Sequence, residues 1–490
     1  MVARHVSRHA SPTLVEIDVH RHLDEPIVRQ IVRQLRGLID SGRLQSDARL
    51  PASRDLAAQL GVARNCVVNA YDELIAVGLL EGRGRHGTFV RSGASGGSVR
   101  PAPHTPLPAV LERLQAPTPV DETGGVASLD WRPESAHAHA LPLGVWRNAC
   151  REAGRHLPPQ DYGDPRGERG LRRGIARWLR THRSVDVDPD HVVVTHGVGN
   201  DLQLVSQALL NGGDLCVIED PGYQRAMTAF TRAGATVRPV PVDRDGLLVE
   251  HVVVDGAVPQ MVHITPAHQY PLGGRLPRSR REALIELARQ HGILIVEHEY
   301  DSEFQHEGTR LPPIFASAPD TTMLIGTFAR VVGPSLRLGF IVAPSAVAEA
   351  LAAFVDRECR HVSLPAQRVA EFLLASGQLD RHLRRMQRHY AAMRNTLLAR
   401  LAVHADRIDL HGDRVGLHVW IAGRDPAFDR ALRAALQSRG IRFNEVARFS
   451  TLNGDVPGFV FGYGYLTPAM LERSLDEIDD CIRALTGGAS

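Results

Sequence analysis

Apolar residues in the first part of the chain recur at the spacing of helices and then of a hairpin. The first helical stripe consists of Ile27, Ile31, Leu35, Leu38 and Ile39. Residues 50–61 predict a short helix closed by a glycine, and a second helix starts near Ala63. Residues 79–90 surround a glycine-rich tip, which predicts two paired strands. Together these elements predict a winged helix-turn-helix domain over residues 12–91.

Short apolar runs alternate with helical stretches from residue 127 onward. The runs cover residues 191–195, 215–218, 293–296 and 323–325, and they are rich in valine, isoleucine and leucine. Strands that are apolar throughout need cover on both faces, as in a parallel sheet between helices. We therefore predict a multi-domain α/β protein whose second domain spans residues 127–487.

The segment between these domains, residues 92–126, is rich in serine, glycine and proline. Its prolines favour a semi-rigid linker, with one short helix expected around residues 110–114.

Composition adds few constraints. The chain has 490 residues, of which 43% are hydrophobic and 23% charged, as in ordinary globular proteins. No apolar run approaches the roughly 18 residues of a membrane span, and the start lacks the apolar core of a signal peptide. The five cysteines have no CxxC spacing, which favours reduced thiols. We expect a cytoplasmic protein without a membrane partner.

The basic residues are unusual because all 57 are arginine and the chain contains no lysine. A base composition that favours arginine codons would explain why arginine replaces lysine at surface positions where the two residues are interchangeable. A lysine required for chemistry would not be exchangeable, because a guanidinium stays protonated.

The predicted second helix of the helix-turn-helix would present its first residues to DNA bases. Arg64 suits guanine and Asn65 suits adenine, although an arginine at a helix start also commonly contacts phosphate. The following hairpin carries Arg83, Arg85 and His86, and residues 82–94 contain no carboxylate. This basic tip suits DNA phosphates, and the alternative is a solvated basic loop.

The stretch "LPASRDLAAQLGVARNCVVNAYDELIAVGLLEGRGRHGTFV" resembles the GntR family of transcription regulators. The resemblance implies binding to a double-stranded DNA operator. The positions that it assigns to DNA contact are Arg54, Arg64, Asn65, Cys66, His86 and Gly87, and the basic charge of the wing adds Arg85.

The second domain resembles the aminotransferase-like domain of the MocR/GabR-type subgroup. The segments that carry this resemblance are "YGDPRGERGLRRGIARWL", "VVVTHGVGNDLQL", "EDPGYQRA", "ITPAHQYPLGG", "ILIVEHEYDSEF" and "IGTFARVVGPSLRLGFIVAP". The resemblance implies a fold like that of pyridoxal phosphate (PLP)-dependent transferases, with a smaller C-terminal α+β subdomain and a head-to-tail homodimer.

Three positions depart from the chemistry of that family. The lysine that forms an imine with the cofactor falls at Arg330, and a guanidinium cannot form this bond. The aspartate that pairs with the pyridinium nitrogen falls at His298, which brings no negative charge. The arginine that binds a substrate carboxylate falls at Val460. We therefore expect no covalent PLP and no transaminase activity.

Other positions keep part of an anion site. The resemblance places Thr327 and Arg337 at the cofactor phosphate, while Ala329 replaces a hydroxyl and Asp201 adds a competing carboxylate. The further expected ligand-binding residues are Gly197, Val198, Gly199, Tyr223, His268, His298, Tyr300 and Arg330.

A buried arginine needs a counter-ion, and the nearest acidic residues to suggest as partners of Arg330 are Glu297 and Glu299. His137 and His139, together with His268 and His298, have no spacing diagnostic of a metal site, so we expect no metal.

The preferred prediction is a DNA-binding regulator whose degenerate second domain senses an unidentified small ligand or serves dimerisation. A regulator that binds PLP non-covalently is the first alternative. An active aminotransferase is the second, and the lack of lysine argues against it.

Overall fold

The structure is a computed structural model that describes residues 15–22, 25–92, 129–133, 141–412, 414–452, 454 and 456–487. The chain divides into two compact units, Met1–Gly124 and Gly125–Ser490. Nearly all of the predicted linker, its expected short helix, and both His137 and His139 lie outside the described residues.

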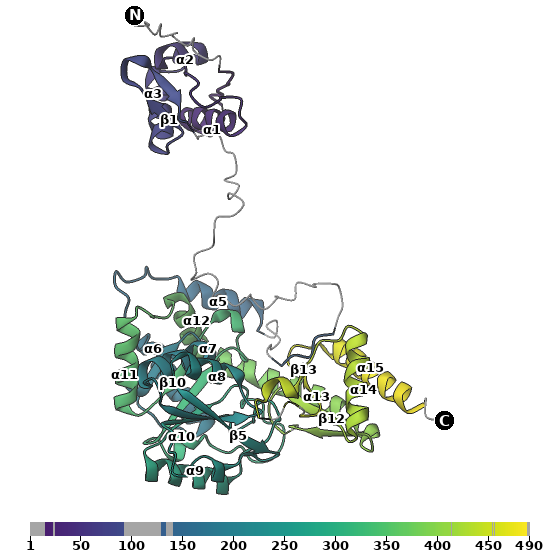
Figure 1. The fold of residues 1–490 in the computed structure, drawn as a ribbon. Coiled ribbons are helices and arrows are strands. Elements are labelled where there is room, and N and C mark those ends of the chain that lie inside the picture. The colour runs from purple at the N-terminus through teal and green to yellow at the C-terminus, as the bar shows by residue number, and fades with distance from the viewer. Residues whose placement is uncertain are drawn as a thin grey trace, which may run out of the picture. The chain divides into compact units, whose positions relative to one another are not determined.

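The described part of the first unit is a three-helix bundle with a two-stranded hairpin (Figure 1). Its elements are α1 Ile27–Asp40, α2 Ser53–Leu60, α3 Arg64–Ala76, β1 Leu80–Gly82, the 3₁₀ turn η1 Gly84–His86 and β2 Thr88–Val90. The predicted apolar stripe of α1 is buried at Ile31, Leu35 and Ile39, where it packs against Val67 and Leu74 of α3. This packing confirms the predicted winged helix-turn-helix.

The turn between α2 and α3 depends on Gly61. This glycine ends α2 in the left-handed conformation, with φ of 66°. A residue with a Cβ atom rarely adopts this backbone, which explains the glycine that the sequence pattern singled out. The chain then enters α3 at Arg64, so the first turn of α3 faces away from the core.

The second unit contains an eight-stranded sheet in the order β3-β10-β9-β8-β7-β4-β5-β6. Strands β5, β4, β7, β8 and β9 pair in parallel, whereas β10 is antiparallel to both β9 and β3, and β6 is antiparallel to β5. The strands are β3 Val192–Thr195, β4 Leu215–Asp220, β5 Thr236–Asp243, β6 Gly246–Leu247, β7 Met261–Ile264, β8 Leu294–His298, β9 Thr322–Thr327 and β10 Gly339–Val342. The mostly parallel sheet agrees with the prediction.

Helices cover both faces of this sheet, as the continuous apolar strands required. Two consecutive residues of β4 show this directly, because their side chains point to opposite faces of the sheet. Ile218 packs under α7 and α8, while Val217 packs under α9. The helices of this layer structure are α5 Leu143–Ala153, α6 Arg169–Arg183, α7 Val198–Leu209, α8 Gln224–Arg232, α9 Arg278–His291, α10 Ile314–Ser317, α11 Ser345–Arg357 and α12 Leu364–Ala375. The sheet edge at the carboxyl ends of β8 and β9 stays open for a site.

A smaller α+β subdomain follows, as expected. Its antiparallel sheet has the order β11-β12-β14-β13. The elements are α13 Gln378–Leu401, β11 Ile408–His411, β12 His418–Gly423, α14 Pro426–Ser438, β13 Asn444–Glu445, β14 Phe459–Gly462 and α15 Pro468–Gly487. The sequence did not indicate that Trp131, far away in the chain, completes this subdomain. Its ring lies 4.8 Å from that of Phe461, and its indole nitrogen donates to Ser474 Oγ at 2.9 Å.

None of the helices in the described part of the chain combines the length and apolar composition needed to cross a membrane.

Candidate functional site

The first turn of α3 presents polar side chains to solvent. Arg64 and Asn65 are exposed and Cys66 is half-buried. Arg54 on α2 is also exposed. Arg64 Nε donates to Ser53 Oγ at 3.3 Å, which holds the guanidinium near the start of α2. These residues therefore form one accessible polar surface, as expected for the predicted DNA contacts.

The tip of the hairpin carries the second group of predicted DNA contacts. Arg85 and His86 lie exposed in η1, and Gly87 follows with φ of 104°. Arg83 differs from its neighbours because it forms ion pairs with Asp47 and Glu81. The sequence predicted a basic tip without carboxylates, and this prediction was incomplete. Both carboxylates belong to residues outside 82–94 and reach the tip in the folded domain.

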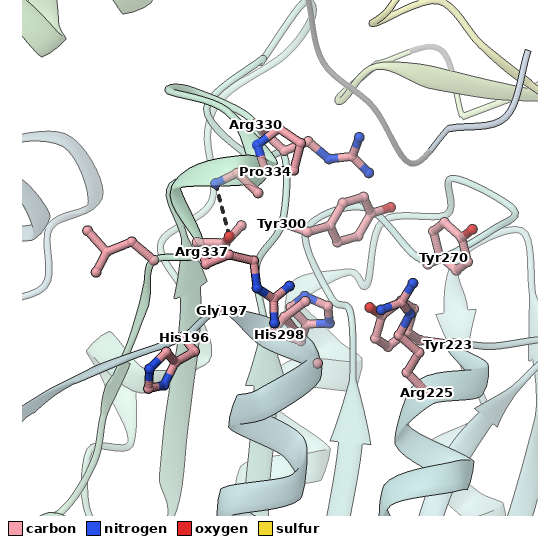
Figure 2. A pocket seen from close by; sticks show the side chains of 15 residues that line it. His196, Gly197, Tyr223, Arg225, Tyr270, His298, Tyr300, Arg330, Pro334 and Arg337 are labelled. Atoms are coloured by element: carbon pink, nitrogen blue, oxygen red, sulfur yellow. Dashed lines mark hydrogen bonds between the residues drawn. The ribbon is translucent and has the colours of Figure 1, made fainter. Parts of the chain in front are cut away.

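A pocket of about 310 Å³ opens at the carboxyl ends of the parallel strands (Figure 2). His298 is the last residue of β8 and Thr327 is the last residue of β9. Nine of the ten expected ligand-binding residues line it: Gly197, Val198, Gly199, Tyr223, His298, Tyr300, Thr327, Arg330 and Arg337. The remaining lining residues are His196, Arg225, Tyr270, Ala329, Pro334 and Leu338. Gly197 and Arg337, which are 140 positions apart in the chain, thus meet because successive strands end at one edge of the sheet.

Helix α7 points its N-terminus at the pocket. Gly197 caps the helix with φ of 91°, and the free amides of the first turn lie beside Arg337 (Figure 2). Free helix amides and a guanidinium both favour an anion. The expected competition from Asp201 is weaker than the sequence implied. Burial raises the pKa of this fully buried carboxyl to about 7, so it is protonated over much of the range near neutrality.

His298 lies against aromatic rings at the base of the pocket. Its ring centroid is 5.1 Å from that of Tyr223 and 5.6 Å from that of Tyr300. Only 3% of the residue is exposed, and neither ring nitrogen has a hydrogen-bond partner among the described residues. Burial, followed by the neighbouring His263, holds the pKa of His298 well below its ordinary value. The imidazole is therefore neutral and offers one donor and one acceptor to a ligand.

Three guanidinium groups face this pocket, and none of its lining residues is acidic. They belong to Arg225, Arg330 and Arg337, and none has an ion-pair partner among the described residues. Arg330 Nη1 is buried and has no hydrogen-bond partner there. The lining of the pocket is therefore positively charged and favours an anion.

The expected pairing of Arg330 with Glu297 or Glu299 is wrong. Glu297 accepts the backbone amides of Ile314 and Phe315 at 2.8 and 3.0 Å. Glu299 forms a buried ion pair with Arg183. Both carboxylates point away from the pocket because alternate residues of an extended chain face opposite sides of the sheet.

His268 lies behind the pocket wall instead of lining it, which corrects its predicted place. Both Asp301 carboxylate oxygens lie 3.1 Å from His268 Nδ1, and the Tyr300 hydroxyl donates to the His268 carbonyl at 2.8 Å. Asp301 also accepts the backbone amide of Leu417 at 3.1 Å. His268, Asp301 and His418 are the group in the described part of the chain whose side chains could together hold a metal ion. Their potential ligand atoms all lie within 4.8 Å of one another. The hydrogen bonds of Asp301 connect the large and small subdomains here.

Val460 occupies the place where the family resemblance put a substrate-binding arginine. It is fully buried on β14 in an apolar cluster with Tyr270 and Tyr300. Val460 does not line the pocket, and it offers no charge to a ligand.

Five lining residues were missed from the sequence, namely His196, Arg225, Tyr270, Pro334 and Leu338, and Arg225 and Tyr270 among them bring a cation and an aromatic ring to the pocket. Arg225 stands at the start of α8, two positions after Tyr223, inside a segment already singled out for family resemblance. Tyr270 precedes a cis proline, Pro271, and its ring lies edge-on to Tyr223 with centroids 5.7 Å apart. The signal for both was present as proximity to quoted motifs, but spacing alone does not show which way a side chain points.

Comparisons with known proteins match both parts of the chain. The profile "Bacterial regulatory proteins, gntR family" matches residues 27–90, and "Aminotransferase class I and II" matches residues 134–454. The "Probable rhizopine catabolism regulatory protein MocR" of Rhizobium meliloti is 31% identical over 474 residues, which cover 95% of each chain. The "HTH-type pyridoxine biosynthesis transcriptional regulator PdxR" of Corynebacterium glutamicum is 31% identical over 480 residues, covering 95% of this chain and 98% of that one.

Solved structures match the second unit. A multiple substrate aminotransferase from Thermococcus profundus superimposes with a TM-score of 0.68 at 19% identity, covering 78% of this chain and 98% of that chain. LysN, an α-aminoadipate aminotransferase from Thermus thermophilus, gives 0.67 at 22% identity with the same coverage. At these identities the likeness establishes the aminotransferase fold.

Proposed function

The chain belongs to the GntR family of bacterial regulatory proteins, in the MocR-like group with an aminotransferase class I and II domain, and we propose that it is a transcription regulator that senses a small anionic ligand. The first unit binds a double-stranded DNA operator through Arg64, Asn65 and the tip of the wing. The second unit holds the ligand in the pocket between α7 and Arg330. Family resemblance supports a head-to-tail homodimer as the working form.

The observation that carries this proposal is the set of Arg225, Arg330 and Arg337 around a pocket without an acidic lining residue. Each cation in a partly buried site loses hydration, and the loss must be compensated by a counter-ion. Because Glu297 and Glu299 are bound elsewhere, a ligand is the natural source of that negative charge.

Covalently bound PLP does not fit these residues. Arg330 stands where an amine would have to attack the cofactor aldehyde, and the chain has no lysine to replace it. His298 is neutral, and its two buried nitrogens have no hydrogen-bond partner among the residues that the structure describes, so it cannot stabilise a protonated pyridine ring as a carboxylate does. We therefore propose that the second unit has no transaminase activity.

The experiment that tests this proposal uses the full chain with PLP and borohydride, followed by peptide mass spectrometry. Wild type should acquire no label on residues 325–340, whereas Arg330→Lys, as a positive control, should acquire one. Label on wild type within this segment, or turnover of an amino donor, would contradict the proposal.

Non-covalent PLP binding remains a second candidate, favoured by Thr327, Arg337 and the α7 N-terminus in the pocket. Added PLP should then raise the unfolding temperature by mass action without any borohydride label. An unchanged unfolding temperature at saturating PLP would exclude this candidate.

A further inference from the structure

The positive groups of the pocket are distributed over two sides. Arg225 and Arg337 lie on the side of helix α7, whereas Arg330 lies on the other side, beyond Tyr300 (Figure 2). Arg225 Nη1 is 3.5 Å from the position of a Cβ atom on Gly199, within the first turn of α7. The pocket therefore offers positive charge on both sides of Tyr300 (Figure 2).

The α7 side suits a phosphate group. It combines free amides of a helix N-terminus, two guanidinium groups and the hydroxyl-bearing Thr327. Such a set of donors matches an anion with several oxygens, because each oxygen accepts more than one hydrogen bond.

The side of Arg330 suits a carboxylate. Its guanidinium is planar and presents parallel N–H groups that match the two oxygens of a carboxylate. Arg330 Nη1 is buried and has no partner among the described residues, so this donor is unsatisfied until a ligand provides an acceptor.

The space between the two sides suits a flat body. Tyr223 and Tyr300 flank His298 with ring centroids 5.1 and 5.6 Å away, and neither nitrogen of His298 has a hydrogen-bond partner within the described part of the chain. The volume of about 310 Å³ lies at the lower end of ligand pockets, which span about 300–1,000 Å³. The ligand is therefore small, with a planar group that hydrogen-bonds to a neutral imidazole.

We propose that the effector is a phosphorylated compound that also carries a carboxylate on a flat, unsaturated body, with the carboxylate bound by Arg330. This inference rests on the proposed function and specifies its ligand class. Arg330 then binds the ligand through an ion pair, at the position where the related enzymes have a lysine that binds the cofactor covalently.

The test uses three probes that differ in one substituent of the same ring: pyridoxine 5′-phosphate (alcohol), PLP (aldehyde) and 4-pyridoxic acid 5′-phosphate (carboxylate). Their affinities for the full chain are measured by calorimetric titration. We expect the carboxylate probe to bind at least about tenfold more tightly than the alcohol, since a charge-assisted pair is worth this much. Arg330→Gln should reduce that difference to less than about twofold.

Arg337→Gln is the matched variant, and it should weaken all three probes because each contains the phosphate. Unliganded unfolding temperatures confirm that both variants are folded. Equal affinity of wild type for the alcohol and carboxylate probes would overturn the inference, as would no binding of the carboxylate probe at millimolar concentration. These outcomes leave operator binding and the borohydride result unchanged, so failure of the proposed function is recognised separately.

Discussion

Arg183 and Glu299 form a buried ion pair, with 3% and 5% of their side chains exposed. This pair removes from Arg330 a carboxylate that lies close in sequence. The two arginines therefore differ in kind: Arg183 stabilises the fold through an internal partner, whereas Arg330 is available to a ligand.

This difference predicts opposite effects on stability. Arg183→Ala removes the ion-pair partner of the buried Glu299 and should lower the free energy of unfolding by about 3–5 kcal/mol. Arg330→Gln removes a cation that forms no ion pair among the described residues and only attracts Asp301 from a longer range, so it should change the free energy of unfolding by less than about 1 kcal/mol. Denaturant unfolding of the ligand-free protein measures both. Similar losses in the two variants would show that Arg330 has a structural partner.

DNA binding should depend differently on α3 and on the wing. Arg64→Ala should cost about 1–3 kcal/mol of affinity for an operator selected from a random DNA pool, and less for unrelated DNA. Arg85→Ala should weaken binding to all DNA and reduce the slope of log affinity against log salt by about 1. Fluorescence anisotropy over a salt series distinguishes these effects.

Arg83 is the control for the wing. Because it is paired with Asp47 and Glu81, Arg83→Ala should change the salt slope much less than Arg85→Ala. If the two variants have the same slope, the ion pairs of Arg83 do not persist in the complex.

These examples show how far sequence carried the prediction. Helical and strand periodicity located Ile31, Leu35 and Ile39 in one core and predicted the parallel sheet, because both depend on local spacing. The partners of Arg83 and Glu299 could not be predicted in this way. Asp47 and Arg183 reach them from other elements, and only the packing of those elements sets such contacts.

The same distinction between local pattern and tertiary packing applies to the pocket. Motif resemblance identified most of its lining, but His268 was misplaced because its ring is held by Asp301 behind the wall. Arg225 was missed because a single arginine in an arginine-rich chain has no distinguishing pattern.

Asp201 predicts a pH dependence of stability. Its pKa in the folded protein, about 7, lies above the ordinary value of 3.8, so the folded state binds the proton more tightly. The stability from this group is present below about pH 4 and is lost as pH rises through 7. Asp201→Asn should therefore gain stability relative to wild type as pH increases, on the order of 2–4 kcal/mol by pH 8. Denaturant unfolding between pH 4 and 8 measures this difference.

The same ionisation places negative charge beside the α7 N-terminus. Phosphorylated probes should therefore bind wild type less tightly at pH 8 than they bind Asp201→Asn, while the two proteins should agree at pH 5.5. A constant ratio of affinities across this range would contradict the assignment of the charge to Asp201. Comparison with the variant also cancels the titration of the probe and of Glu219, whose pKa burial raises to about 7.

Gly416 is required by the network around Asp301. A Cβ atom there would overlap His268 Nδ1 and an Asp301 oxygen, and the backbone has φ of 85°. Gly416→Ala should lower the free energy of unfolding by about 3 kcal/mol or more. Gly440 has a similar φ of 75° but nothing within 4 Å, so Gly440→Ala should cost only about 1 kcal/mol. Equal losses in chemical denaturation would mean that the loop of Gly416 relaxes freely.

The apolar surroundings of Val460 also limit what a single substitution at this position could restore. An arginine introduced at this buried position would meet Tyr270 and Tyr300 before it met any ligand. A single substitution at Arg330 or at His298 would likewise supply one part of the pyridoxal phosphate chemistry without the other. If the second unit has no transaminase activity, as proposed, restoring that activity would require changes at several of these positions together.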